Sequence, residues 1–253
     1  MQTGNMTTST NGGTAPAMRP VLLLPGYWLG AWIWGPIVES LTGRGVRAQA
    51  VTLPGLESSQ PRRDQVHFAD HVDFVGANLE AFGEPAVLAA HSGSGAVATA
   101  VSDRVPELLA KIVYVDSGPC TDGTIPVPDL PAEATELPFP GVDALPGIGA
   151  SVEGISDQDK ARFEALAVPH PAGACREPVE LHDPRRNAIP ATLVCCSIRS
   201  EQVRELAAAG EPTFAAVNDL TDLTFIDLPT GHWPMFSRPD DLAELLYREA
   251  ADA

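Results

Sequence analysis

The 253-residue sequence predicts an α/β fold with a mostly parallel, doubly wound sheet, and two observations support this. From Pro20 onward, short apolar runs alternate with stretches whose apolar residues recur at helical spacing. Several of the apolar runs end in turns that contain Gly and Pro, which interrupt regular structure. Apolar residues make up 44% of the chain, enough for a substantial buried core.

The predicted elements follow one another in strand–helix order. The expected strands are 20–26, 46–55, 85–92, 111–118, 191–197 and 223–229. The expected helices are 33–45, 68–83, 95–110 and 239–251, and residues 201–210 form a further amphipathic stretch. Such alternation indicates strand–helix–strand units, in which a helix returns the chain to the start of a parallel strand.

Residues 120–190 interrupt this order. Proline and glycine are dense here, and only 156–167 predicts a clear helix, with Ser156 as its N-cap. A segment this long inside a regular alternation is typical of an insertion. We expect a core of residues 19–119 and 191–253, and a lid at 120–190 over the ends of the strands; a disordered loop is the alternative.

The composition excludes several classes of function. The net charge of −17 argues against binding to nucleic acid or to an anionic membrane surface. No apolar run approaches the ~20 residues of a membrane span, and residues 1–18 lack the apolar segment of a signal peptide. These residues are expected to form a disordered tail on a soluble, cytoplasmic protein. The four cysteines have neither CxxC nor zinc-site spacing, so neither metal nor cofactor is expected.

The stretch LAAHSGSGAVATAV, residues 88–101, has the layout of a nucleophile elbow, a sharp turn from a strand into a helix. Such a turn exposes its central side chain and needs small residues two positions to either side, as Ala90 and Ser94 are around Ser92. Ser94 is the alternative nucleophile, but a strand that ends at His91 places Ser92 in the turn and Ser94 in the helix. A phosphate-binding loop is disfavoured because the GxxxxGK[ST] pattern is absent and no lysine is near.

A nucleophilic serine needs a general base, and His232 is the best-placed histidine. It follows the last predicted strand, lies in a turn that contains glycine, and precedes the last helix. The other five histidines lie at less suitable places in the predicted order: His67, His71, His91, His170 and His182.

Three segments in this order together resemble the α/β-hydrolase superfamily, in the small branch of esterases, methylesterases, lactonases and hydroxynitrile lyases. Residues 21–55, VLLLPGYWLGAWIWGPIVESLTGRGVRAQAVTLPG, resemble the opening of that branch, with Pro25 where a His usually stands. The serine turn resembles Gly-His-Ser-x-Gly, and residues 231–246, GHWPMFSRPDDLAELL, resemble the histidine segment. The resemblance covers the core from Pro20 to the C-terminus and omits the lid.

The resemblance implies an oxyanion hole and a triad acid. The backbone N–H groups of Tyr27 and Gly93 are the expected donors to the oxyanion. The acid's commonest place, after strand 191–197, holds no Asp, although Glu201 is nearby. Asp116, at the end of strand 111–118, is the favoured acid, because some members of the superfamily, including lactonases, take the acid from that position. Glu201 remains the alternative.

The expected activity is hydrolysis of a neutral, fairly apolar carboxylic ester or lactone through a Ser92–His232–Asp116 triad and an acyl-enzyme. Trp28, His91 and Trp233 are expected to contact this small-molecule substrate.

Two other functions remain open. A hydroxynitrile-lyase-like C–C lyase needs a lysine in the pocket, and neither Lys111 nor Lys160 is well placed for that role. A non-catalytic small-molecule-binding homologue of the hydrolases is the second alternative.

Overall fold

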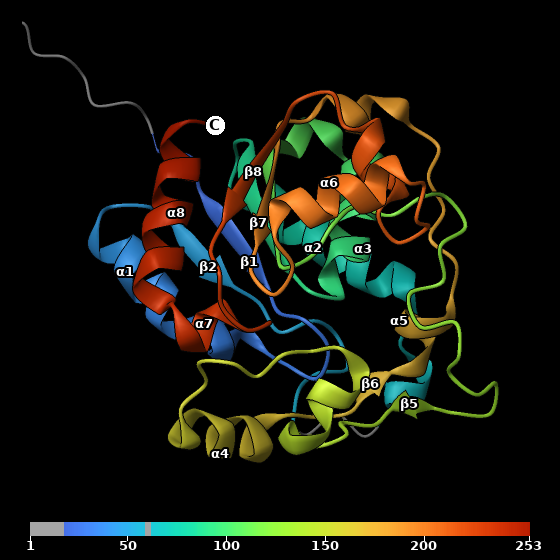
Figure 1. Ribbon diagram of the computed structural model, residues 1–253. Helices are drawn as coiled ribbons and strands as arrows, with labels where there is room; N and C mark the ends of the chain where they lie inside the picture. Colours follow the sequence, from blue (N-terminus) through green and yellow to red (C-terminus); the bar gives the residue numbers. More distant parts are fainter. Residues whose placement is uncertain (1–17, 59–61) are drawn as a thin grey trace, which may run out of the picture.

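The computed structural model describes residues 18–58 and 62–253 and is built around a six-stranded sheet (Figure 1). The strand order is β2-β1-β3-β4-β7-β8, and each strand is parallel to its neighbours. The strands are β1 (Val21–Leu24), β2 (Ala48–Ala50), β3 (Ala86–His91), β4 (Leu109–Val115), β7 (Ala191–Cys195) and β8 (Leu223–Asp227). The predicted α/β fold with a parallel sheet is confirmed.

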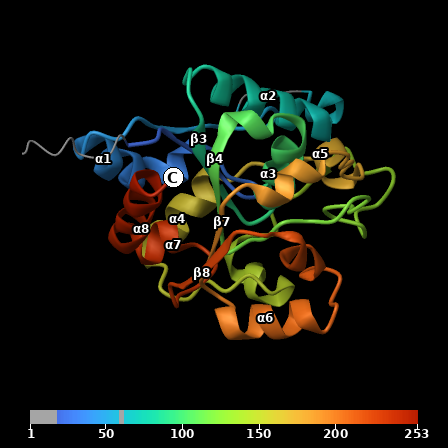
Figure 2. The same ribbon diagram turned by 90° about the horizontal axis from the view of Figure 1, so that it is seen from above.

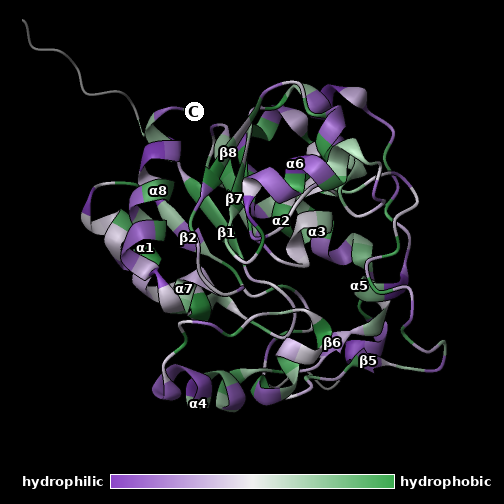
Figure 3. Ribbon diagram, in the orientation of Figure 1, coloured by the Kyte–Doolittle hydropathy of each residue, from purple (hydrophilic) through white to green (hydrophobic). Residues whose placement is uncertain are grey.

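Helices cover both faces of the sheet (Figures 1 and 2). The helices α1 (Gly35–Gly43), α7 (Pro234–Ser237) and α8 (Pro239–Ala251) lie on one side, and α2 (Phe68–Glu80), α3 (Ser94–Arg104) and α6 (Ser200–Ala208) on the other. Because strand side chains alternate between faces, Leu22 and Leu24 of β1 pack into one core and Val21 and Leu23 into the other. The inner strands β1, β3 and β7 are therefore buried on both faces, and β1 is coloured as hydrophobic in Figure 3.

The insertion at 120–190 has more regular structure than the sequence predicts. Its helix α4 (Asp157–Leu166) is confirmed, and the Ser156 hydroxyl accepts a hydrogen bond from the Asp159 amide at 3.1 Å. It also contains α5 (Ala172–Arg176) and a small antiparallel sheet of β5 (Glu136–Leu137) and β6 (His170–Pro171). These elements are too short to produce a periodic pattern.

The insertion packs against loops at the carboxyl ends of the strands. The Trp28 indole N–H, just after β1, donates to the Leu137 carbonyl at 3.1 Å. The His232 amide, after β8, donates to the Ser151 carbonyl at 2.7 Å. The insertion thus lies along the edge of the sheet where parallel α/β proteins bind ligands.

Most of the predicted N-terminal tail, residues 1–17, lies outside the described residues. Met18, which the prediction also assigned to the tail, instead packs against the core that contains α1 and α8. Across 18–58 and 62–253, no helix is long and apolar enough to span a membrane.

Candidate active site

The turn between β3 and α3 holds Ser92 in a left-handed backbone conformation, with φ of 53°. This conformation is uncommon for a residue with a side chain, and it turns the chain sharply between the strand and the helix. Neighbouring segments approach the turn closely. A Cβ on Gly26 would lie 2.8 Å from His91 Nδ1 and 2.9 Å from Ser92 Cβ, so only glycine fits there.

A chain of hydrogen bonds joins Ser92, His232 and Asp116, which follow β3, β8 and β4 respectively. Ser92 Oγ lies 2.7 Å from His232 Nε2, and His232 Nδ1 lies 2.5 Å from Asp116 Oδ2. The side chains of His232 and Asp116 are only 17% and 6% exposed. The structure thus brings together the three residues that the sequence selects, in the order nucleophile, base and acid.

The Asp116 carboxylate is held by the segment that follows β7. Its Oδ1 accepts hydrogen bonds from the amides of Cys196 and Ser197 at 3.0 and 2.9 Å. Its Oδ2 accepts a bond from the Ser197 hydroxyl at 2.6 Å, in addition to the bond with His232. Burial opposes ionisation of Asp116, but these bonds and the charge of His232 hold the pKa of its carboxyl below the usual value. Asp116 is therefore ionised at neutral pH.

Glu201, the alternative acid, is exposed on α6, and no hydrogen bond joins it to His232 within the described part of the chain. The end of β7, where a triad acid is most common, instead supplies Ser197 as a donor to Asp116. Ser197 was not among the residues expected at the site, because a serine after a strand gives no signal of its partner.

The backbone N–H groups of Tyr27 and Gly93 donate to no protein acceptor in the described residues, so both remain able to bind an oxyanion. The Ser94 hydroxyl, buried in the first turn of α3, donates to the Pro25 carbonyl and ties the loop after β1 to the helix. Ser94 thus holds the loop after β1 in place. The Ser117 hydroxyl donates to the Ser92 carbonyl at 2.5 Å and fixes the turn from the other side.

His91 was expected to contact the substrate, but in the structure it instead holds another residue of the site in place. Its side chain is fully buried, and its Nε2–H donates to the His232 carbonyl at 2.8 Å. Burial, together with the nearby His232, lowers the pKa of His91 to about 3, so its ring is neutral. A neutral ring at this place positions the backbone of His232 without adding charge.

Trp28 and Trp233 are the other two predicted substrate contacts, and both are more than nine-tenths buried. The Trp233 ring lies 4.8 Å from the His232 ring and 5.2 Å from that of Phe163 on α4. Trp28 has φ of 66° and packs against Phe139 at 5.7 Å. Through these aromatic contacts the insertion packs against the loop after β1, which carries Trp28, and the loop after β8, which carries Trp233.

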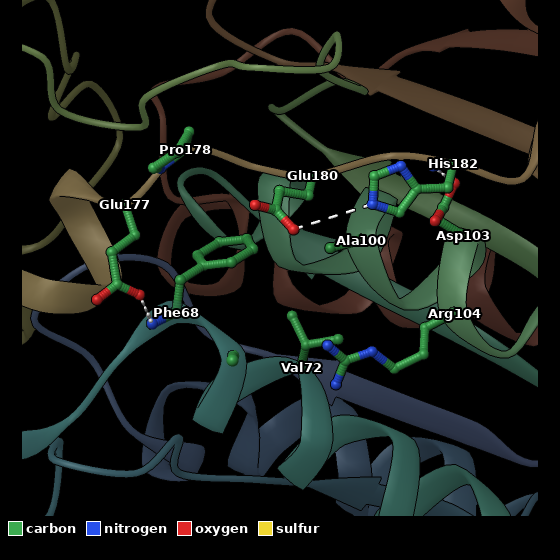
Figure 4. Close-up of a pocket in the computed structure, with 10 residues that line it drawn as sticks. Phe68, Val72, Ala100, Asp103, Arg104, Glu177, Pro178, Glu180 and His182 are labelled. Carbon is green, nitrogen blue, oxygen red and sulfur yellow. Dashed lines mark hydrogen bonds and ion pairs between the residues drawn. The ribbon is translucent and has the colours of Figure 1, made fainter.

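Two other groups of residues lie apart from Ser92. Lys111 pairs with Glu249 at 3.0 Å, and Glu249 also accepts a bond from Thr192, so this lysine is fixed among buried groups of the core. A groove of about 560 Å³ lies between α2, α3 and residues 177–182, and none of Ser92, His232 and Asp116 lines it (Figure 4). In the described ranges, no group of three His, Cys, Asp or Glu side chains is arranged to hold a metal.

The arrangement of sheet, serine turn and histidine loop agrees with comparisons to known proteins. A model of the alpha/beta hydrolase family matches residues 21–245. The chain belongs to this family. A protein from rice (Oryza sativa subsp. japonica), Esterase PIR7B, is 32% identical over 121 residues. That match covers 46% of this chain, and the chain spans 45% of the length of the esterase.

Several solved structures are similar to this chain in fold. An extracellular alpha/beta-hydrolase from a Paenibacillus species has a TM-score of 0.68 at 20% identity, over 90% of this chain and 98% of its own. The methylesterase MES16 from Arabidopsis has a TM-score of 0.70 at 17% identity, over 92% and 100%. Tomato methylketone synthase I has 0.71 at 17% identity, over 93% and 99%. The predicted α/β-hydrolase fold is confirmed.

Proposed function

We propose that the protein is a serine hydrolase that cleaves neutral, fairly apolar carboxylic esters or lactones. The observation that carries this proposal is the unbroken hydrogen-bond chain from Ser92 through His232 to Asp116. This is the arrangement that makes a serine hydroxyl nucleophilic at neutral pH. The esterase relative from rice supports the same class of reaction.

In the proposed mechanism, Ser92 Oγ attacks the acyl carbon while His232 Nε2 takes its proton. Asp116 orients the ring through Nδ1 and stabilises the imidazolium that forms. The amides of Tyr27 and Gly93 bind the oxyanion, and each such donor is worth about 3 kcal/mol in the transition state. His232 then protonates the leaving alcohol and activates the water that hydrolyses the acyl-enzyme.

The surroundings of the site support a neutral substrate. The net charge of −17 disfavours anionic substrates in general. Trp28 and Trp233 adjoin Tyr27 and His232 in the chain and place apolar rings beside the site, which suits an apolar ester or lactone better than a charged one.

The test is labelling with a fluorophosphonate probe, read by intact-mass spectrometry, together with turnover of a panel of esters and lactones. We expect one adduct on the wild type and on Ser94→Ala, and none on Ser92→Ala. An adduct that is lost only in Ser94→Ala would show that the nucleophile is wrongly assigned. No adduct on any of these proteins would favour a non-catalytic binding protein.

The two alternative functions have less support. A cyanohydrin-cleaving lyase would need a lysine beside the serine, whereas Lys111 is paired with Glu249 and Lys160 lies near Asp157 on α4. A non-catalytic binding protein would have no need for the complete hydrogen-bond chain.

A further inference from the structure

The Tyr27 side chain lies directly over the serine turn. A Cβ on Gly93 would be 2.3 Å from Tyr27 Cζ, the ring carbon that bears the hydroxyl, and 2.5 Å from Cε1. Gly93 immediately follows Ser92 in the chain, so the phenol end of Tyr27 lies beside the proposed nucleophile. Only the absence of a side chain at Gly93 allows this approach.

The rest of the ring packs between the core and the insertion. Its centroid lies 4.8 Å from the ring of His170 on β6 and 5.9 Å from that of Trp28, in edge-to-face arrangements. Tyr27 also packs against an apolar cluster of the insertion, whose buried members are Leu130, Ala172 and Cys175. The ring is therefore held in place from several sides, and its hydroxyl has a fixed position relative to Ser92.

The Tyr27 hydroxyl makes no hydrogen bond to another described residue, and the residue is half-buried, so the hydroxyl can reach a ligand. Burial raises the pKa of this phenol far above its usual range, and the nearby Cys175 and Cys120 thiols act in the same direction. The hydroxyl is therefore a neutral donor at neutral pH. Free donors in apolar surroundings of a site are the groups that fix a ligand's orientation.

We propose that the Tyr27 hydroxyl donates a hydrogen bond to a second oxygen of the substrate, away from the scissile carbonyl. The inference rests on the proposed function and narrows its substrate class to esters or lactones that carry a further acceptor, such as a ketone or an ether oxygen. Tyr27 then has two separable contacts with the substrate. Its backbone N–H binds the oxyanion, and its side chain recognises the second oxygen.

The test compares wild type, Tyr27→Phe and Tyr27→Leu on matched substrates. In one pair, p-nitrophenyl hexanoate is compared with the same ester carrying a ketone in its acyl chain. In the other pair, a plain ester is compared with the same ester carrying an ether oxygen in its alcohol part. Both variants keep the backbone N–H and lack the hydroxyl. Tyr247→Phe is the control, since Tyr247 is also half-buried but lies on α8 against Arg44.

We expect the kcat/KM of Tyr27→Phe to fall about tenfold more on the oxygenated member of at least one pair than on its plain ester. Tyr27→Leu should show the same selectivity, and Tyr247→Phe should show none. Equal losses on both members of both pairs, or no loss, would overturn the role of Tyr27 while leaving the hydrolase intact. A wild type that cleaves no ester and takes up no fluorophosphonate would overturn the proposed function itself.

Discussion

The Ser197 hydroxyl donates to Asp116 Oδ2, the same carboxylate oxygen that accepts the hydrogen bond from His232. One oxygen thus has two donors at 2.6 and 2.5 Å, which fixes the rotamer of Asp116 and the orientation of the imidazole.

Removal of this hydroxyl should therefore slow the reaction without weakening substrate binding. We expect Ser197→Ala to lower kcat about tenfold with little change in KM, and Ser197→Thr to restore most of the rate, because threonine keeps the donor. Ser200→Ala is the matched control. Ser200 makes the same pair of bonds, through its amide and hydroxyl, to Asp227 at the end of β8. Equal rates for Ser197→Ala and Ser200→Ala would refute a positioning role.

The acid assignment has its own test. Asp116→Asn keeps the shape of the side chain but removes the charge that stabilises the imidazolium, so kcat should fall by roughly 10⁴-fold. Glu201→Gln should retain full activity, because this carboxylate is exposed on α6. Steady-state rates on a p-nitrophenyl ester measure the activity of both variants. A large loss in Glu201→Gln with activity retained in Asp116→Asn would reverse the assignment.

Gly26 tests the tight packing behind the serine. The side chain of Gly26→Ala would overlap the ring of His91 and the Cβ of Ser92. We expect it to destabilise the fold by about 1–3 kcal/mol, as other overpacked sites do, and to reduce activity. Chemical denaturation gives the free energy of unfolding. Gly35→Ala is the comparison, since nothing lies within 4 Å of a Cβ there, and its stability should not fall. A Gly26→Ala variant that is as stable and active as the wild type would contradict the close packing of His91 and Ser92 against Gly26.

Three buried histidines should make the folded protein less stable at acidic pH. Burial lowers the pKa of His71, His91 and His170 in the folded state. The unfolded chain then binds more protons than the folded one once the pH falls below the unfolded histidine value, about 6.5. Stability is therefore complete above that pH and is lost below it, by at most about 1.4 kcal/mol per pH unit for each histidine. Urea unfolding measured at several pH values gives this slope.

A single substitution separates the contribution of one histidine. His170→Leu should reduce the slope below pH 6.5, because it removes a buried ring whose pKa is lowered by folding. The His170 ring makes no hydrogen bond to another described residue, so the substitution breaks none. His182→Leu should leave the slope unchanged, since that ring is 77% exposed. An unchanged slope in His170→Leu would assign the acid sensitivity to other groups, such as Asp116, whose contribution is lost only near and below pH 3.8.

The sequence predicts most of the fold, because the strands are buried on both faces and therefore form continuous apolar runs. The helix α4 was predictable from its cap at Ser156, which the structure confirms. The short elements of the insertion were not. Residues 136–137 and 170–171 pair through backbone hydrogen bonds across a long stretch of chain, and two-residue strands have no measurable period.

The site was predictable where a residue's place in the strand order determines its neighbours. Ser92, Asp116 and His232 all follow parallel strands and so lie at one edge of the sheet. Supporting residues follow no such rule. His91 was expected to contact the substrate, yet this last residue of β3 is fully buried and its ring donates to the His232 carbonyl. The partners of Ser94 and Ser197 depend on loop conformations that the sequence does not encode locally.

Three residues with side chains have positive φ in the described chain: Trp28, Ser92 and Asp116. All three belong to the site, and such conformations cost of order 1–3 kcal/mol each. Glycine would relieve the strain at Ser92, so Ser92→Gly would yield a more stable but inactive protein. At Trp28 and Asp116 the strain is outweighed by aromatic packing and by hydrogen bonds that glycine would lose. Engineering of this protein for higher stability should leave these three residues unchanged and place its substitutions elsewhere.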